Sequence, residues 1–240
     1  MKTHYVKTSN HKDFATHYAA IEARGSRERC ILLLTGVPGS GKTRLVDNFG
    51  SEHDAVYLEG IPGMSLSFLK DHLCNETKVS SPRRFEEYKM LREFLEVRRL
   101  PLILDEAQHG LPNKAACIEY LRRLAELAGV PLILVCHESE KNGFGRHKHI
   151  ADRVGSVCTL KKATLDDVAL YCRELCEVEL ADEVLAATLA QSRGLYRLMG
   201  DAVANLERIA KKLGKTRLEA ADINKIPLCE DLTARLRGVA

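Results

Sequence analysis

The chain has 240 residues, and its 36 Lys and Arg nearly balance its 33 Asp and Glu, so that the formal net charge is +3. Hydrophobic residues make up 45% of the chain and charged residues 29%, a composition that is typical of globular proteins and excludes a disordered or collagen-like chain. No apolar run approaches the roughly 20 residues that span a bilayer, and the basic N-terminus lacks the apolar segment of a signal peptide. We therefore expect a cytoplasmic protein without a membrane partner.

Five short apolar runs alternate with helical patterns between residues 30 and 160. Runs of this length without in/out alternation are typical of strands that are covered on both faces. Between them, residues 83–99 and 115–127 repeat Leu and Phe at three- and four-residue spacing, as amphipathic helices do. The alternation predicts an α/β fold with a parallel, doubly wound sheet of five strands. The predicted strands are Cys30–Thr35, Ala55–Leu58, Leu100–Leu104, Val130–Cys136 and Ser156–Leu160.

The strand pattern stops after residue 163, and a helical pattern follows. Thr164, with Asp167 three residues later, is typical of a helix start, while Gly194 and Gly214 are placed to end helices. We expect helices over residues 165–177, 181–192, 195–213 and 219–236.

This change of pattern divides the chain into three predicted parts. Residues 1–29 form a basic lead-in with one helix at about Asp13–Arg24, residues 30–162 form the α/β domain, and residues 163–240 form a small all-helical domain with a tail.

Eight cysteines are spread along the chain, most of them within apolar runs. None of their spacings is C-x-x-C, and a chain of this length can form a full core without disulfide staples. Cys172 and Cys176 are one helical turn apart and could share a metal, but no second ligand pair follows them. We interpret the cysteines as reduced core residues.

The strongest motif is a glycine-rich loop at residues 36–43 with the sequence G-x-x-x-x-G-K-T. It follows a predicted strand and opens a helix, which is the setting that a phosphate-binding loop requires. The glycines let backbone N–H groups surround a phosphate, and the helix N-terminus adds its partial positive charge. Lys42 is expected to reach the β- and γ-phosphates, and Thr43 to bind Mg²⁺. The predicted nucleotide-binding residues are Gly36, Val37, Pro38, Gly39, Ser40, Gly41, Lys42, Thr43 and Arg44.

A second motif, at residues 102–106, is an apolar strand that ends in two carboxylates. Asp105 stands where an aspartate would hold Mg²⁺, and Glu106 could polarise a water molecule for attack on the γ-phosphate. This acid pair favours hydrolysis over nucleotide binding alone, and it argues against a small-molecule kinase. A third strand ends in His137, which could sense the phosphate or orient the water, or could have only a structural role.

Together these motifs resemble those of an AAA+ ATPase. The resemblance rests on the GVPGSGKT loop, the strand ends LILDEAQH and CHES, Asp152-Arg153-Val154 before the last strand, and Gly194-Leu195-Tyr196-Arg197 in the helical part. The DEAQH sequence and the compact size of the chain are similar to those of the AAA+ branch that assists DNA transposases. This branch includes the phage Mu B protein, TnsC and IstB. The resemblance covers about residues 20–215 and implies ATP and Mg²⁺ as cofactors.

The resemblance also implies roles for two arginines. Arg153 matches the arginine finger, which stabilises the transition state in a neighbouring subunit, and Arg197, on the helical lid, matches the sensor arginine. Arg146 and Arg193 are their nearest rivals. His137 departs from the small polar residue that is usual at the first sensor position. A finger that acts in trans implies self-association into a ring or a helical filament.

Two basic stretches, residues 78–99 and 141–162, suit a polyanionic partner, although the absence of Trp argues against a base-stacking surface. In the transposition branch the filament forms on duplex DNA, and its DNA-facing residues come from segments after the second strand and near the acid motif. Contacts to phosphates carry no sequence information, so we expect binding with little sequence preference. The candidate DNA-binding residues are Lys70, Lys78, Arg83, Arg84 and Lys114.

We therefore predict an ATP-hydrolysing AAA+ protein that oligomerises on duplex DNA and selects target DNA for, or activates, a transposase. Two alternatives stay open. One is a helicase loader or a secretion-type ATPase with a similar core, and the other is a nucleotide-gated signalling switch that oligomerises without DNA. The C-terminal residues 211–237 either contact the transposase or form only a lid helix and tail.

Overall fold

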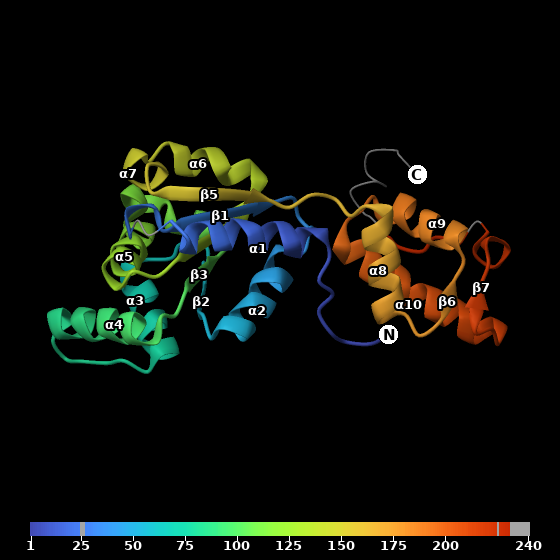
Figure 1. The fold of residues 1–240 in the computed structure, drawn as a ribbon, viewed down its shortest axis with the longest axis horizontal. Helices are drawn as coiled ribbons and strands as arrows, with labels where there is room; N and C mark the ends of the chain where they lie inside the picture. Colours follow the sequence, from blue (N-terminus) through green and yellow to red (C-terminus); the bar gives the residue numbers. More distant parts are fainter. Residues whose placement is uncertain (25–26, 225, 231–240) are drawn as a thin grey trace. The chain divides into compact units, whose positions relative to one another are not determined.

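The computed structural model describes residues 1–24, 27–224 and 226–230, and the chain forms two compact units (Figure 1). The first unit contains Asp13–Pro38 and Lys42–Leu160. The second contains Met1–Lys12, Gly39–Gly41 and the C-terminal part from Lys161. The first twelve residues and the tip of the glycine-rich loop therefore pack with the C-terminal part, whereas the sequence pattern groups residues 1–29 as one lead-in.

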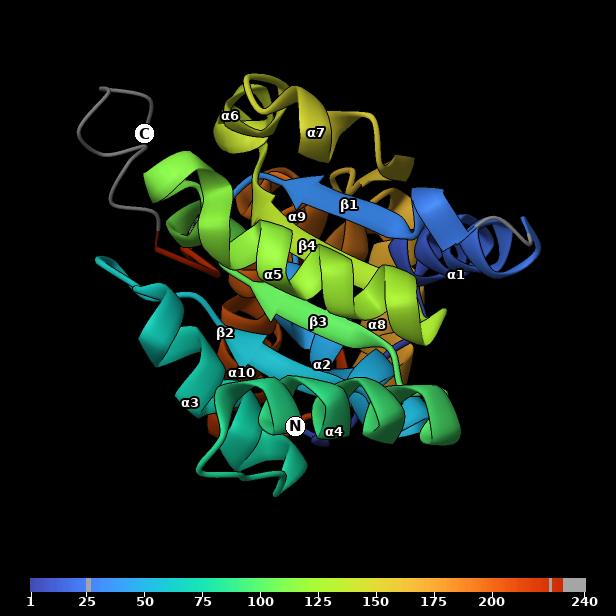
Figure 2. The same ribbon diagram turned by 90° about the vertical axis from the view of Figure 1, so that its left-hand side faces the viewer.

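The first unit contains a sheet of five parallel strands in the order β2-β3-β4-β1-β5. The arrowheads of β2, β3 and β4 point the same way in Figure 2. The strand β1 lies between β4 and β5, and all six of its residues are buried. The predicted α/β fold with a five-stranded parallel sheet is confirmed. The strands are β1 (Ile31–Gly36), β2 (Val56–Glu59), β3 (Leu102–Asp105), β4 (Leu132–His137) and β5 (Val154–Thr159).

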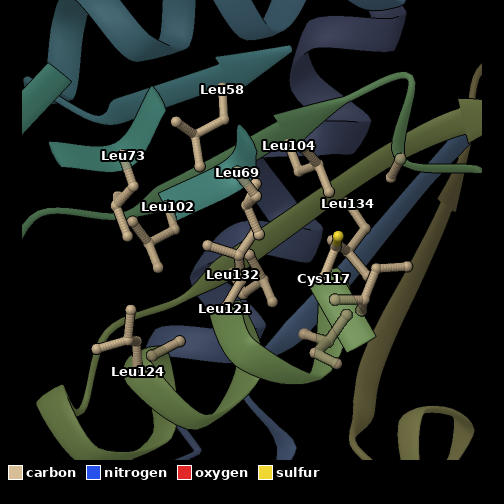
Figure 3. Close-up of a cluster of buried hydrophobic side chains, with 14 of the residues drawn as sticks. Leu58, Leu69, Leu73, Leu102, Leu104, Cys117, Leu121, Leu124, Leu132 and Leu134 are labelled. Carbon is tan, nitrogen blue, oxygen red and sulfur yellow. The ribbon is translucent and has the colours of Figure 1, made fainter. Parts of the chain in front are cut away.

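Helices cover both faces of this sheet. On one face, α3 (Leu66–Thr77), α4 (Arg84–Arg98) and α5 (Pro112–Ala128) contribute leucines to a core that they share with the strands. Figure 3 shows part of this core, with Leu73 of α3 beside Leu102 of β3. The helix α2 (Lys42–His53) lies behind the strands in Figure 2.

The helix α1 (Ser9–Glu22) begins in the second unit and continues into the first. In the first unit, its Phe14 ring packs edge-on against Phe49 of α2, with 5.2 Å between the ring centroids. The remaining elements of the first unit are short: η1 (Arg27–Arg29), η2 (Ala107–Gly110), η3 (Glu138–Glu140), α6 (Lys141–Gly145) and α7 (Lys148–Ala151).

The C-terminal part of the second unit consists mainly of three helices, α8 (Leu165–Leu175), α9 (Asp182–Ser192) and α10 (Tyr196–Leu213). They confirm three of the four helices predicted after residue 163. Two short strands, β6 (Glu179–Leu180) and β7 (Arg217–Leu218), pair in parallel and are an addition to the all-helical prediction. The fourth predicted helix, over 219–236, is wrong in its described part, where only the 3-10 turn η4 (Ala220–Ile223) forms; residues 231–240 lie outside the described residues.

All eight cysteines are free thiols, and six of them are buried. Burial raises the pKa of Cys172 to about 12, and it also raises the pKa of Cys176. Within the part of the chain that the structure describes, no three metal-binding side chains gather at one place. No helix in that part is both long enough and apolar enough to cross a membrane.

Candidate functional site

The glycine-rich loop connects β1 to α2 and needs glycine at two positions. Gly39 and Gly41 have φ angles of +79° and +88°, in the left-handed region that a side chain would strain. Between them, Ser40 is 3% exposed, and its hydroxyl oxygen has no hydrogen-bond partner among the described residues. The loop thus turns sharply around a buried polar atom just before α2 begins.

Lys42 and Thr43, the first residues of α2, bring an ammonium and a hydroxyl group to the end of β1. The Lys42 ammonium donates hydrogen bonds to the carbonyl oxygens of Gly36 and Val37 at 2.8 and 3.2 Å. The Thr43 hydroxyl donates to Asp105, with 2.8 Å between Oγ1 and Oδ2. The loop and the acid motif meet because β1 and β3 are parallel and end at the same edge of the sheet. Arg44 follows on the same helix and is exposed.

The two adjacent carboxylates at the end of β3 have different surroundings. Asp105 is 3% exposed, and its Oδ1 accepts a hydrogen bond from the backbone N–H of Glu106 at 2.8 Å. Glu106 is exposed and adopts a left-handed backbone, with φ 48° and ψ 41°. This conformation is costly for a residue other than glycine and is typical of functional sites. It turns Glu106 out of the strand, where its carboxylate accepts a hydrogen bond from the Gln108 amide.

His137 ends β4 and pairs in register with Gly36, the first residue of the glycine-rich loop. Its Nδ1 accepts a hydrogen bond from the Ser139 backbone N–H at 3.1 Å and lies 2.6 Å from the Ser139 hydroxyl. These contacts fix the orientation of the imidazole ring beside the loop. The role of His137 as a sensor stays a prediction.

The residues at this edge of the sheet fit a nucleotide with Mg²⁺. Hydroxyl and carboxylate oxygens are the ligands that Mg²⁺ prefers, and Thr43 and Asp105 hold one of each 2.8 Å apart. The positive φ angles of Gly39 and Gly41 suit a loop whose N–H groups surround a phosphate. The N-terminus of α2 and the Lys42 ammonium would add positive charge. When bound there, Mg²⁺ would neutralise charge on the phosphate oxygens.

Arg153 lies at the opposite end of the sheet. It precedes Val154, which pairs with Ile31 at the start of β1, whereas the glycine-rich loop begins at Gly36. Five residue steps of a strand, at about 3.3 Å each, place about 16 Å between these ends. That distance is more than an arginine side chain spans, so Arg153 cannot reach the loop of its own unit. Arg146, its rival, is exposed between α6 and α7.

Two glutamates hold Arg153 within the first unit. Its Nη1 lies 3.3 Å from Glu28 and 4.0 Å from Glu126. Glu126 also pairs with Arg122, which is only 6% exposed. A cavity of about 510 Å³ is found here, lined by Glu28, Arg29, Arg122, His149, Asp152 and Arg153.

Arg197 and its rival Arg193 both belong to the second unit. Arg193 ends α9 in a left-handed conformation, and Arg197 lies in the first turn of α10. The Arg197 backbone N–H donates to the Gly39 carbonyl oxygen at 3.2 Å, while its side chain is exposed. Of the two, Arg197 is therefore the residue whose backbone contacts the tip of the glycine-rich loop.

The five candidate DNA-binding residues have different surroundings. Lys78, Arg83 and Arg84 are exposed at the connection between α3 and α4. Lys70 is half-buried, and its ammonium lies 4.8 Å from the centre of the Tyr120 ring. This cation–π contact gives Lys70 a structural partner, so it is the weakest of the five candidates.

Lys114 is exposed within an unusual left-handed turn at the start of α5. Asn113, Lys114 and Ala115 have φ angles of 53°, 60° and 58°. Each left-handed residue other than glycine costs about 1 kcal/mol or more, and the three together form a strained segment at the start of α5. The sequence pattern had predicted a regular helix from Ala115.

Sequence reasoning missed two residues that contact the acid motif. The Tyr57 hydroxyl of β2 donates to Asp105 Oδ2 at 3.0 Å, and the Gly60 backbone N–H donates to the Asp105 carbonyl oxygen at 2.8 Å. Both follow from the pairing of β2 with β3, in which Glu59 lies opposite Asp105. In the sequence, the only feature that distinguishes Tyr57 is its hydroxyl group within an otherwise apolar strand.

Comparisons with known proteins agree with this architecture. Residues 24–142 match the family model described as "AAA domain". Cdc6p from Pyrobaculum aerophilum has a TM-score of 0.66 at 18% identity, covering 93% of this chain and 68% of that one. RuvB, the Holliday junction branch migration motor of Thermotoga maritima, has a TM-score of 0.62 at 20% identity, covering 92% and 68%.

A Walker-type ATPase of Pyrococcus abyssi has a TM-score of 0.56 at 14% identity, covering 88% of this chain and 68% of that one. At such identities the structures establish the fold alone. No curated protein sequence matches the chain. The loop and acid pair at one edge of a five-stranded sheet, together with the match over residues 24–142, show that this part of the chain is similar to an AAA domain of the P-loop type.

Proposed function

We propose that this chain is a Mg²⁺-dependent ATPase that assembles on duplex DNA in its ATP state, and that it selects target DNA for, or activates, a transposase. The observation that carries the ATPase part is the hydrogen bond between Thr43 and Asp105 with Glu106 next in sequence. It joins a phosphate-binding loop to the acid pair that hydrolysis requires.

The residues of the site have different roles in ATP hydrolysis. Lys42 and the loop N–H groups bind the phosphates, and Thr43 and Asp105 hold Mg²⁺. Glu106 orients a water molecule and accepts its proton as the water oxygen bonds to the γ-phosphorus, while the bond to the ADP oxygen breaks. The exposure of Glu106, in contrast to the burial of Asp105, supports these different roles.

Self-association is supported by the position of Arg153. Its place about 16 Å along the sheet from its own loop supports a role in the site of a neighbouring subunit. A ring or a helical filament would bring the two ends together, so that one subunit completes the site of the next.

Duplex DNA as the partner is supported by exposed basic residues. Lys78, Arg83, Arg84 and Lys114 are exposed on the first unit, and RuvB, which has a similar fold, is named as a branch migration motor that acts on a DNA junction. Arginine and lysine at such positions would contact phosphates and give salt-dependent binding without base readout.

The test measures fluorescence anisotropy of a labelled random-sequence duplex with ATP, with ADP and without nucleotide, across a range of salt concentrations. We expect tight binding only with ATP. Glu106→Gln should lower the hydrolysis rate by about 10²- to 10⁴-fold and keep the protein on DNA after ATP is added, because ATP binds but is not cleaved. Glu183→Gln, an exposed glutamate on α9, is the matched control and should behave as the wild type.

A second experiment removes positive charge from the proposed DNA-binding surface. The double variant Arg83→Ala/Arg84→Ala should make the slope of log K against log salt shallower, by the amount expected for the loss of about two phosphate contacts. The double variant Lys211→Ala/Lys212→Ala removes the same charge from the second unit and should leave it unchanged. ATP-dependent assembly with no DNA binding in any nucleotide state would instead favour the signalling switch.

A further inference from the structure

Tyr57 is placed to control the carboxylate that would hold Mg²⁺. Its hydroxyl donates to Oδ2 of Asp105 at 3.0 Å, and the Thr43 hydroxyl donates to the same oxygen at 2.8 Å. The other oxygen, Oδ1, accepts the backbone N–H of Glu106. Three donors, from β2, from α2 and from the residue directly after β3, therefore fix both oxygens of a side chain that is 3% exposed.

The strand register explains how Tyr57 reaches Asp105. In the pairing of β2 with β3, Tyr57 lies opposite Ile103 and Glu59 lies opposite Asp105. Side chains two residues apart lie on the same face of a sheet, so the Tyr57 hydroxyl and the Asp105 carboxylate meet on one face.

We infer that Tyr57 is a positioning residue that orients Asp105 for Mg²⁺ and thereby sets the affinity of the site for the metal. The inference rests on the proposed nucleotide site and adds to it a residue outside both the loop and the acid motif. Groups that hydrogen-bond to a metal ligand typically change metal affinity or activity by about 10- to 100-fold when they are removed. The Tyr57 hydroxyl donates to Asp105, and Tyr57 acts on the metal through this carboxylate.

The test is Tyr57→Phe, which removes the hydroxyl and keeps the ring that packs in β2. Binding of a fluorescent ATP analogue is followed in EDTA and then during a Mg²⁺ titration. We expect unchanged binding in EDTA, and a Mg²⁺ concentration at half-saturation about 10-fold higher than for the wild type. Tyr88→Phe is the matched control: this tyrosine of α4 packs edge-on against Tyr120 and should leave both measurements unchanged.

Two results would overturn the inference. One is a Mg²⁺ titration of Tyr57→Phe that coincides with that of the wild type. The other is an equal loss of binding in EDTA, since that would mean that Tyr57 supports the loop rather than the metal ligand. A wild-type protein that binds no nucleotide at all would overturn the proposed function together with the inference, and it is recognised before any variant is made.

Discussion

At the residue scale, Gly60 shows how closely β2 must approach the acid motif. A Cβ at this position would lie 2.5 Å from the Glu106 carbonyl oxygen and 3.1 Å from that of Asp105, and both are backbone atoms that cannot swing aside. We expect Gly60→Ala to displace Glu106 and to lower the hydrolysis rate by about 10²-fold, while binding of a fluorescent ATP analogue persists. Gly145→Ala is the control, because a Cβ there meets nothing within 4 Å. Full activity of Gly60→Ala would show that Glu106 tolerates the shift.

At the scale of elements, Asp167 joins two helix starts within the second unit. Its carboxylate accepts hydrogen bonds from the N–H and hydroxyl groups of both Ser9, on α1, and Thr164, which caps α8. Burial favours the neutral acid, but these hydrogen bonds outweigh it and lower the pKa of Asp167. Its stabilisation is therefore present above the unfolded pKa of about 3.9 and is lost as the pH falls through the folded value. Asp167→Ala should cost about 2 kcal/mol at pH 7, measured by denaturant unfolding, and progressively less as the pH falls through the folded pKa. Asp166→Ala, which is exposed in the same turn, should change stability by less than about 0.5 kcal/mol; equal losses for both would contradict this role.

At the scale of the whole molecule, the proposed role of Arg153 as an arginine finger predicts that a neighbouring subunit takes part in hydrolysis. Arg153→Ala should lower turnover by about 10³-fold or more and leave nucleotide binding intact, because the side chain is too far from its own loop. Mixing Arg153→Ala with Glu106→Gln should restore part of the activity, since each variant supplies the group that the other lacks at a shared site. Arg146→Ala serves as the control. Two inactive variants that stay inactive when mixed, although they assemble together, would remove Arg153 as the finger. Arg153 pairs with Glu28 at 3.3 Å, and a role as a finger would exchange this ion pair for a contact with the neighbour.

Local signals predicted most of the elements. The strands were visible as continuous apolar runs because a sheet with helices on both faces buries every strand position. The start of α8 was visible because Thr164 and Asp167 form a capping box within four residues. The helix α3 was missed although Leu69 and Leu73 have helical spacing, and the two-residue strands β6 and β7 are too short to show any periodicity.

By itself, the sequence determined the phosphate-binding loop and the acid pair, because each is a run of consecutive residues whose chemistry depends on local conformation. Only the tertiary structure decided which strand lies beside β3. That choice brings Tyr57 to Asp105, 48 residues away, and presses Gly60 against Glu106. It also places Arg153 at the far end of the sheet, beside Glu28. These contacts join segments that are far apart in the chain. They form only when the strands pack in this order, and no single segment of the sequence encodes that order.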